Sequence, residues 1–265
     1  MVSHNTKEPD SVYYKPRGDE VEIFARAWKQ KLPVLIKGPT GAGKSRFVEF
    51  MASKLSLPLI QVACNEDTSA SDLLGRFLLR GNETVWEDGP VTRAVRQGCL
   101  LYLDEIAEAR PDVVVVLHSL TDHRRSLYLD KINEVVAAPD SFLLVASYNP
   151  GYQSGLKELK PSTKQRFIGL SFYYPSAEEE AEIILHESGI SSDMARKIAR
   201  LGQKIRNASE LVLRETVSTR LLVYAAKLME AGLQPRESAT TAIAEILTDD
   251  AETLAALKDM IALSF

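Results

Sequence analysis

The sequence has 265 residues, of which 45% are hydrophobic and 26% are charged, with a formal net charge of −4 at pH 7. This length suffices for one large domain, or for one large and one small domain, while the acidic balance and the lack of a dense Lys/Arg run argue against a nucleic-acid-binding surface. No apolar stretch is long enough to cross a membrane and the first residues lack a signal-peptide core, so we expect a cytoplasmic protein with no membrane partner.

Short apolar strands alternate with amphipathic helices along the first two-thirds of the chain. The predicted strands cover residues 34–36, 59–64, 100–103, 142–147 and 168–172, and the predicted helices include residues 19–30 and 111–120. Such alternation predicts an α/β fold, with a parallel five-stranded sheet covered by helices on both faces. After Pro175 the pattern becomes almost entirely helical, so we predict an α/β domain over residues 1–175 and a small helical lid domain over residues 176–265.

Two segments interrupt this alternation, and both read as inserted β-hairpins. Residues 77–90 have Gly81-Asn82 as a turn and Trp86 on the return strand. Residues 127–136 form a second such segment just before the fourth predicted strand.

A complete phosphate-binding loop follows the first predicted strand. Its residues are Gly38, Pro39, Thr40, Gly41, Ala42, Gly43, Lys44 and Ser45. A strand that turns sharply into a helix directs backbone N–H groups and the positive end of the helix dipole at one spot. The glycines let the backbone curl around phosphate oxygens, the lysine ammonium reaches the β- and γ-phosphates, and the Ser45 hydroxyl ligates Mg²⁺. The spacing therefore predicts binding of ATP and Mg²⁺.

The third predicted strand ends in two acids, Asp104 and Glu105. Taken alone, this pair could be a solvated end of a strand. Downstream of a phosphate-binding loop it is typical of a Walker B motif, in which Asp104 holds Mg²⁺ through its water shell. Glu105 would then polarise the attacking water, which is the positioning role that phosphoryl transfer requires.

Three further polar residues are candidates whose position in the sequence leaves an alternative open. Asn149 follows the fourth strand and could bind the γ-phosphate or the attacking water, but Asn149-Pro150 is also a common start of a turn. Arg166 precedes the last strand and Arg220 begins a helix in the second domain. A lone arginine is usually a solvated surface charge, so neither one points to a site by itself.

The order of these features resembles that of an AAA+ ATPase, and longer motifs narrow the resemblance. These motifs are Cys64–Asp67, Ser71–Leu79, Trp86–Pro90, Asn149–Ser154 and Ser162–Phe167. They resemble the MoxR group and, within it, the CbbQ/NorQ/NirQ family, over nearly the whole chain from about Tyr14.

The resemblance implies a homo-hexameric ring with ATP at the subunit interfaces. In that ring Asn149 would be sensor 1, Arg166 an arginine finger supplied to the neighbouring subunit, and Arg220 sensor 2 in the lid. Asn65, which ends the second strand, matches the position of a regulatory residue that holds the catalytic Glu105 inactive until a partner binds. The two hairpins match the family's insertions, one facing the ring pore and one preceding sensor 1.

The same resemblance implies an ATP-driven remodeller of proteins that works with a von Willebrand factor A domain adaptor. CbbQ-type members reactivate inhibited Rubisco, which we take as the first hypothesis. NorQ- and NirQ-type members assist the maturation of nitric oxide or nitrite reductase, which is the alternative. A nucleic-acid motor is disfavoured by the acidic balance of the chain. A small-molecule kinase would not need Asn149, Arg166 and a helical lid in this order.

Overall fold

The computed structural model describes residues 12–150, 159–208, 210–211 and 213–265. The chain divides into two compact units. The first contains the chain up to Gly38 and residues Lys44–Phe172, and the second contains Pro39–Gly43 together with Tyr173–Phe265. The predicted domain boundary between residues 175 and 176 stays a prediction. Within the described ranges, none of the helices has the length and the apolar character that crossing a lipid bilayer requires.

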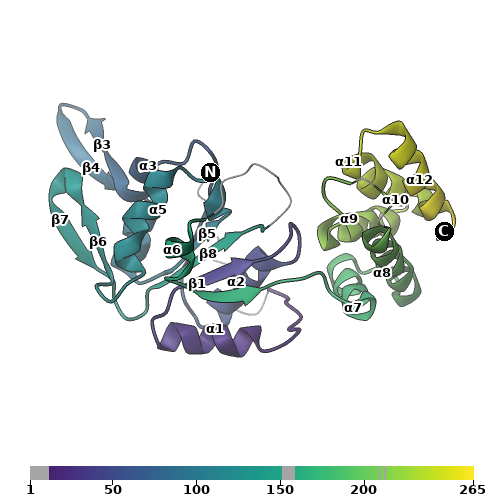
Figure 1. Ribbon diagram of the computed structural model, residues 1–265, viewed down its shortest axis with the longest axis horizontal. Helices are drawn as coiled ribbons and strands as arrows, with labels where there is room; N and C mark the ends of the chain where they lie inside the picture. Colours follow the sequence, from purple (N-terminus) through teal and green to yellow (C-terminus); the bar gives the residue numbers. More distant parts are fainter. Residues whose placement is uncertain (1–11, 151–158, 209, 212) are drawn as a thin grey trace. The chain divides into compact units, whose positions relative to one another are not determined.

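A five-stranded sheet forms the centre of the first unit (Figure 1). Its strands lie in the order β2-β5-β8-β1-β9, and every pair of neighbours runs parallel. Their bounds are β1 Val34–Lys37, β2 Leu59–Ala63, β5 Leu100–Asp104, β8 Leu143–Tyr148 and β9 Ile168–Ser171. The predicted fold class, a parallel five-stranded sheet flanked by helices, is confirmed.

Helices cover both faces of this sheet, which explains why its strands read as continuous apolar runs. The helices of the first unit are α1 Glu20–Lys29, α2 Lys44–Lys54, α3 Ala70–Leu74, α4 Pro90–Gln97, α5 Pro111–Leu117 and α6 Pro161–Lys164. On one face, Leu101 and Leu103 share a buried core with residues of α3, α4 and α5. On the other face, Phe47 of α2 packs against Phe24 of α1 and against Phe172. The distances between ring centroids are 5.4 Å and 5.2 Å, respectively.

Both predicted hairpins are present, with different bounds. The first pairs β3 Gly75–Arg80 with β4 Glu83–Asp88, and the second pairs β6 Ser126–Leu129 with β7 Glu134–Ala137. Assigning Pro90 to the first hairpin was wrong, because Pro90 is the first residue of α4. Proline suits that position, since its missing N–H has no partner within the first turn of a helix.

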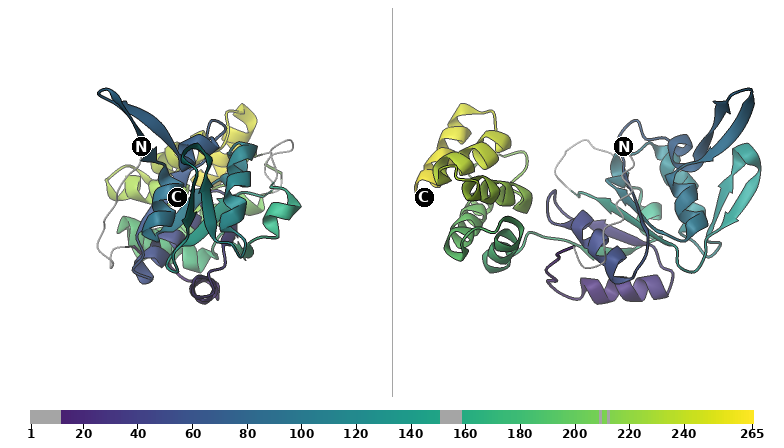
Figure 2. Two further views of the ribbon diagram at one scale, coloured as in Figure 1. Left: turned by 90° about the vertical axis from the view of Figure 1, so that its left-hand side faces the viewer. Right: turned by 180° about the vertical axis from the view of Figure 1, so that it is seen from behind.

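The two hairpins lie at the same end of the first unit (Figures 1 and 2). Arg96 of α4 connects them. Its Nε donates to Asp88 Oδ2 at 2.9 Å, and its two Nη atoms donate to both carboxylate oxygens of Glu134 at 2.7 and 2.6 Å. The hydrogen bonds from Arg96 hold the pKa of the Glu134 carboxyl below its usual value. The pair therefore stays ionised at neutral pH, and both insertions are anchored to one helix.

The helices of the second unit lie between Ala177 and Ala262. Its elements are α7 Ala177–Ser188, α8 Ser192–Asn207, α9 Thr219–Glu230, α10 Pro235–Ala239, the π-helical turn η4 Thr240–Ala244, α11 Glu245–Leu247 and α12 Ala251–Ala262. Ser176, Ser191 and Ser218 cap the starts of α7, α8 and α9 by accepting backbone N–H groups. The apolar faces of these helices form a second buried core. This arrangement gives the all-α region that the sequence predicts.

A substitution in β5 tests the assignment of the first core. Leu101 is 0% exposed, so Leu101→Ala is expected to lower the free energy of unfolding by about 2–5 kcal/mol through lost burial and the cavity left behind. Leu79 in β3 is 79% exposed, and Leu79→Ala is expected to change stability by less than about 0.5 kcal/mol. Urea titration followed by circular dichroism measures both variants. Equal losses in the two would contradict the described core.

Candidate nucleotide site

The carboxyl ends of neighbouring parallel strands meet at one edge of the sheet. In the pairing register, Ala63 of β2 lies opposite Asp104 of β5, and Lys37 of β1 lies opposite Tyr148 of β8. The polar segments predicted to carry the site follow directly after these strand ends. Ligands of open α/β sheets bind outside this edge.

Residues 38–45 connect β1 to α2, and α2 begins at Lys44. Gly41 and Gly43 have φ angles of 70° and 90°, which residues with a side chain rarely adopt. The Lys44 side chain is 7% exposed, and its Nζ donates to the Gly38 carbonyl at 2.8 Å. The ammonium group is thereby held at the base of the loop, where charge-assisted bonds to phosphate oxygens are strong.

Hydroxyl groups from α2, β5 and β8 bind the carboxylate of Asp104. Ser45 Oγ donates to Oδ2 at 3.1 Å, and Tyr102 Oη donates to Oδ1 at 2.7 Å. Ser147 Oγ donates to the same Oδ1. Burial, followed by the charge of Asp104, raises the pKa of Tyr102, so its hydroxyl remains a donor. The direction of this carboxylate is therefore set by three partners.

Glu105 has a left-handed backbone conformation, with φ 56° and ψ 45°. Residues with a Cβ seldom adopt it, and such positions concentrate at functional sites. The N–H of Glu105 donates to Ser147 Oγ at 3.2 Å. One serine thus contacts both acids of the motif. The chain turns immediately after β5, and Glu105 is exposed at this turn.

The loop that carries Asn65 is joined to the end of β5. The N–H of Cys64 donates to the Asp104 carbonyl at 2.9 Å. Burial, and then the charges of Asp104 and Glu105, raise the pKa of the Cys64 thiol to about 12, so the thiol is neutral at physiological pH. Asn65 Oδ1 accepts the N–H groups of Asp67 and Thr68, each at 3.0 Å, which closes a local turn. The regulatory role of Asn65 stays a prediction.

Asn149 follows β8 directly and is half-buried. The strand end before it is joined to the phosphate-binding loop, because the N–H of Gly38 donates to the Tyr148 carbonyl at 3.3 Å. This bond places Asn149 beside the start of that loop, and its sensor role stays a prediction. Residues 151–158, which hold most of the Asn149–Ser154 motif, lie outside the described residues.

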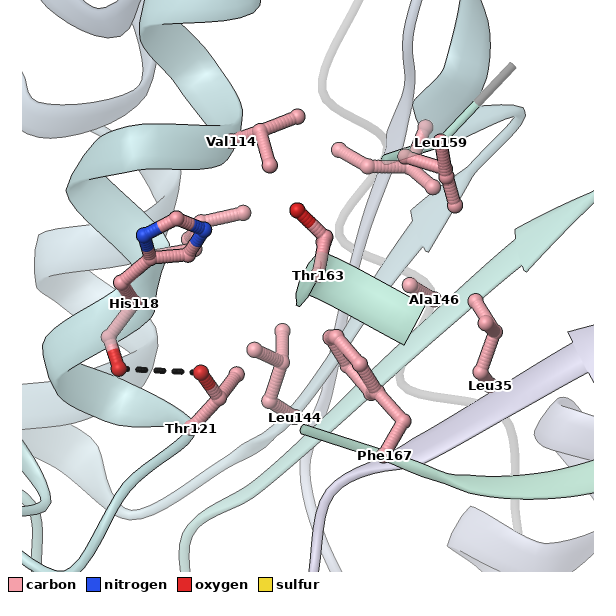
Figure 3. A pocket seen from close by; sticks show the side chains of 11 residues that line it. Leu35, Val114, His118, Thr121, Leu144, Ala146, Leu159, Thr163 and Phe167 are labelled. Carbon is pink, nitrogen blue, oxygen red and sulfur yellow. Dashed lines mark hydrogen bonds between the residues drawn. The ribbon is translucent and has the colours of Figure 1, made fainter. Parts of the chain in front are cut away.

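Arg166 lies between α6 and β9, and its side chain is 35% exposed. Its Nη1 is 3.7 Å from Asp122 Oδ2. Burial, and then the charge of Arg166, lower the pKa of His118. His118 lines a small, mostly apolar pocket together with Thr163 and Phe167, which flank Arg166 in sequence (Figure 3). The described contacts therefore place Arg166 beside Asp122 and His118, and its role as an arginine finger stays a prediction.

Arg220 is the second residue of α9 in the second unit, and its side chain is exposed. Gly41 belongs to the same unit. A Cβ added at Gly41 would lie 2.5 Å from the Cβ of Ser218 and 3.7 Å from that of Arg220. Glycine at this position therefore permits the close approach of the loop backbone to the start of α9.

Comparison with known proteins identifies the family. Residues 33–167 match the AAA domain of the dynein-related subfamily, and residues 180–264 match the CbbQ/NirQ/NorQ C-terminal domain. The chain belongs to the CbbQ/NirQ/NorQ family of AAA ATPases. The resemblance inferred from the sequence motifs is thereby confirmed, and so is the ATPase activity that it implies.

Individual relatives are similar over nearly their whole length. The denitrification regulatory protein NirQ of Pseudomonas aeruginosa is 53% identical, over 94% of this chain and 96% of the relative. Protein NorQ of Paracoccus denitrificans is 53% identical, over 97% of this chain and 95% of the relative. Protein CbbQ of Hydrogenophilus thermoluteolus is 52% identical, over 93% of this chain and 92% of the relative. A solved structure from Cytophaga hutchinsonii, 16% identical, shares the fold over 94% of this ATPase and 90% of that chain, with a TM-score of 0.50.

The sequence interpretation missed Tyr102 and Ser147. Both lie inside apolar strand segments, where a single polar residue is ordinarily read as part of the core. The one available signal was a polar side chain within two residues of a strand end that carries site residues. Tyr102 lies two positions before Asp104 on the same strand. Ser147 contacts Asp104 only because β5 pairs with β8, which brings residues 43 positions apart together.

Ser147→Ala tests whether this serine orients the two acids of the ATPase. The substitution removes a donor to Asp104 and the acceptor of the Glu105 N–H, so kcat is expected to fall about tenfold while the affinity for ATP changes little. Steady-state ATP hydrolysis and binding of a fluorescent ATP analogue give the two quantities. Ser126→Ala, at the first residue of β6, is the matched control. Unchanged turnover in Ser147→Ala would remove this serine from the site.

Proposed function

We propose that this chain uses ATP hydrolysis at the edge of its sheet to remodel a partner protein. The observation that carries the proposal is the Ser45–Asp104 pair. A hydroxyl and a carboxylate, with 3.1 Å between their oxygens, adjoin a loop that holds a buried lysine. Oxygen donors of this kind are what Mg²⁺ prefers, so the residues present fit the ion that accompanies ATP.

Each residue of the proposed site has a distinct part in hydrolysis. The backbone of residues 38–43 and the Lys44 ammonium bind the phosphates. Ser45 and Asp104 would hold Mg²⁺, Ser45 directly and Asp104 through water, and the bound ion would supply positive charge to the phosphate oxygens. Glu105 accepts a hydrogen bond from the attacking water and orients it toward the γ-phosphorus. Asn149 donates to the γ-phosphate or to that water.

Two arginines and one asparagine complete the proposed machinery. Arg166 contributes its charge to the site of the neighbouring subunit in a homo-hexamer, and Arg220 contacts the phosphates from the helical region. Asn65 restrains Glu105 until a partner docks. The partly exposed guanidinium of Arg166 supports a role between subunits, because a wholly enclosed one could not reach a second chain.

Mixing two inactive variants tests action across an interface. Arg166→Ala subunits keep Glu105, and Glu105→Gln subunits keep Arg166. Each alone is expected to lose about 10³-fold or more in ATP turnover. A mixed ring contains interfaces with one intact Glu105 and one intact Arg166, so activity is expected to rise on mixing and to peak at an intermediate ratio. Arg196→Ala, an exposed arginine of α8, is the control. No recovery at any ratio would place both residues in the same subunit's site.

The partner protein is proposed from the family resemblance. Members of the family resembled by this sequence act with a von Willebrand factor A domain adaptor, and we propose such an adaptor here, in the cytoplasm. Two clients then follow: inhibited Rubisco, and a nitric oxide or nitrite reductase that requires maturation. The relatives named NirQ and NorQ are 53% identical and CbbQ is 52% identical. These sequence identities favour neither client, so both clients are tested in one experiment.

A parallel assay distinguishes the two clients. Rubisco preloaded with a tight sugar-phosphate inhibitor is incubated with ATP, the adaptor and this chain, and carboxylation is measured. The reductase is co-expressed with the same pair, and its metal content and activity are measured. Recovery in one arm is expected to require wild-type chain and to be lost with Glu105→Gln. A response in neither arm, despite ATP turnover, would refute both clients and leave the ATPase assignment standing.

A further inference from the structure

The helical second unit encloses a charged pair. Glu180 of α7 is 0% exposed, and Arg206 of α8 donates to its two carboxylate oxygens at 2.7 and 2.8 Å. Thr219 Oγ1, at the first residue of α9, donates to the same carboxylate at 2.6 Å. Taking two charges out of water is costly, and apolar residues of similar volume often stabilise a core as well or better. The fully bonded pair therefore indicates a fixed geometry rather than added stability.

Arg206 extends this cluster in two further directions. Its Nε donates to the carbonyl of Val217, just before α9, at 2.9 Å. Its guanidinium carbon lies over the ring of Tyr174, 4.2 Å from the ring centre. Such cation–π contacts hold a planar guanidinium and an aromatic ring in register. One arginine thus joins α7, the start of α9 and Tyr174.

Tyr174 continues the chain of contacts to the phosphate-binding loop. Its hydroxyl donates to the carbonyl of Thr40 at 3.0 Å. The next loop residue, Gly41, packs against Ser218, the cap of α9. All of these residues belong to the second unit. The loop backbone is therefore in contact with the start of α9 directly, and through Tyr174, Arg206 and Glu180.

We propose that Tyr174, Arg206 and Glu180 are positioning residues that hold the start of α9, and with it Arg220, in register with loop residues Thr40 and Gly41. The proposal rests on the phosphate contact assigned above to Arg220. A nucleotide that binds the loop in the conformation held by Tyr174 also selects the position of α9. Coupling of this kind is reciprocal, so the order of α9 raises nucleotide affinity by the same factor.

Tyr174→Phe is the sharpest variant, because it removes the hydroxyl while keeping the ring over Arg206. Loss of one hydrogen bond that pre-organises a binding loop corresponds to a decrease in ATP affinity of roughly three- to tenfold. Tyr224→Phe, which removes the hydroxyl of a tyrosine that is 50% exposed on α9, is the matched control and is expected to leave affinity unchanged. Binding of a fluorescent ATP analogue to the full chain measures both, with thermal unfolding as a check on the fold.

A double-mutant cycle separates positioning from a purely structural role. In an Arg220→Ala background, Tyr174→Phe is expected to reduce affinity by less than about twofold, because the side chain through which it acts is absent. Glu180→Gln and Thr219→Val are expected to show the same dependence on Arg220 if they remain folded. KM and kcat are measured alongside. KM is expected to rise, while kcat is expected to change little.

Each outcome has one meaning. A loss of ATP affinity in Tyr174→Phe that disappears in the Arg220→Ala background supports the proposal. Equal losses in both backgrounds, or a Tyr174→Phe affinity like that of Tyr224→Phe, overturn it while leaving the role of Arg220 intact. If Arg220→Ala itself binds and hydrolyses ATP normally, the proposed function of Arg220 fails and the positioning proposal fails with it.

Discussion

The carboxylate of Asp104 is fixed by hydroxyl groups from three elements, and the arrangement of the site edge depends on it. Ser45 ties it to the start of α2, Tyr102 to its own strand and Ser147 to β8. Ser147 also accepts the N–H of Glu105, so the acid beside the proposed metal position and the acid beside the proposed water are held by the same neighbour. Preorganised groups of this kind stabilise a transition state without rearranging during the reaction.

The insertions are attached to this frame by one side chain. Arg96 binds Asp88 at the end of the first hairpin and Glu134 at the start of the second. Its helix, α4, packs against β5 through the core that also contains Leu101 and Leu103. Both hairpins are therefore attached to a helix that packs against β5.

Much of the fold was predictable because its signals are local. The phosphate-binding loop consists of contiguous residues, and each strand of the sheet is a short apolar run between polar turns. The turn at Gly81-Asn82 was likewise readable, since Gly81 has the positive φ that such turns require. The helices α3, α4 and α6 escaped prediction. α3 and α6 have five and four residues, too few for a helical period to emerge. α4 was missed because Pro90 was assigned to the end of a hairpin, although it begins this helix.

The sequence by itself determined the family, the parallel sheet, the helical C-terminal region and the set of candidate site residues, because these depend on the order and spacing of residues along the chain. The tertiary structure alone decided which side chains meet. Ser147 reaches Asp104 through strand pairing, and Tyr174 reaches Thr40 across more than a hundred positions. Such contacts carry no local pattern, since strand register and helix packing are cooperative properties of the folded core.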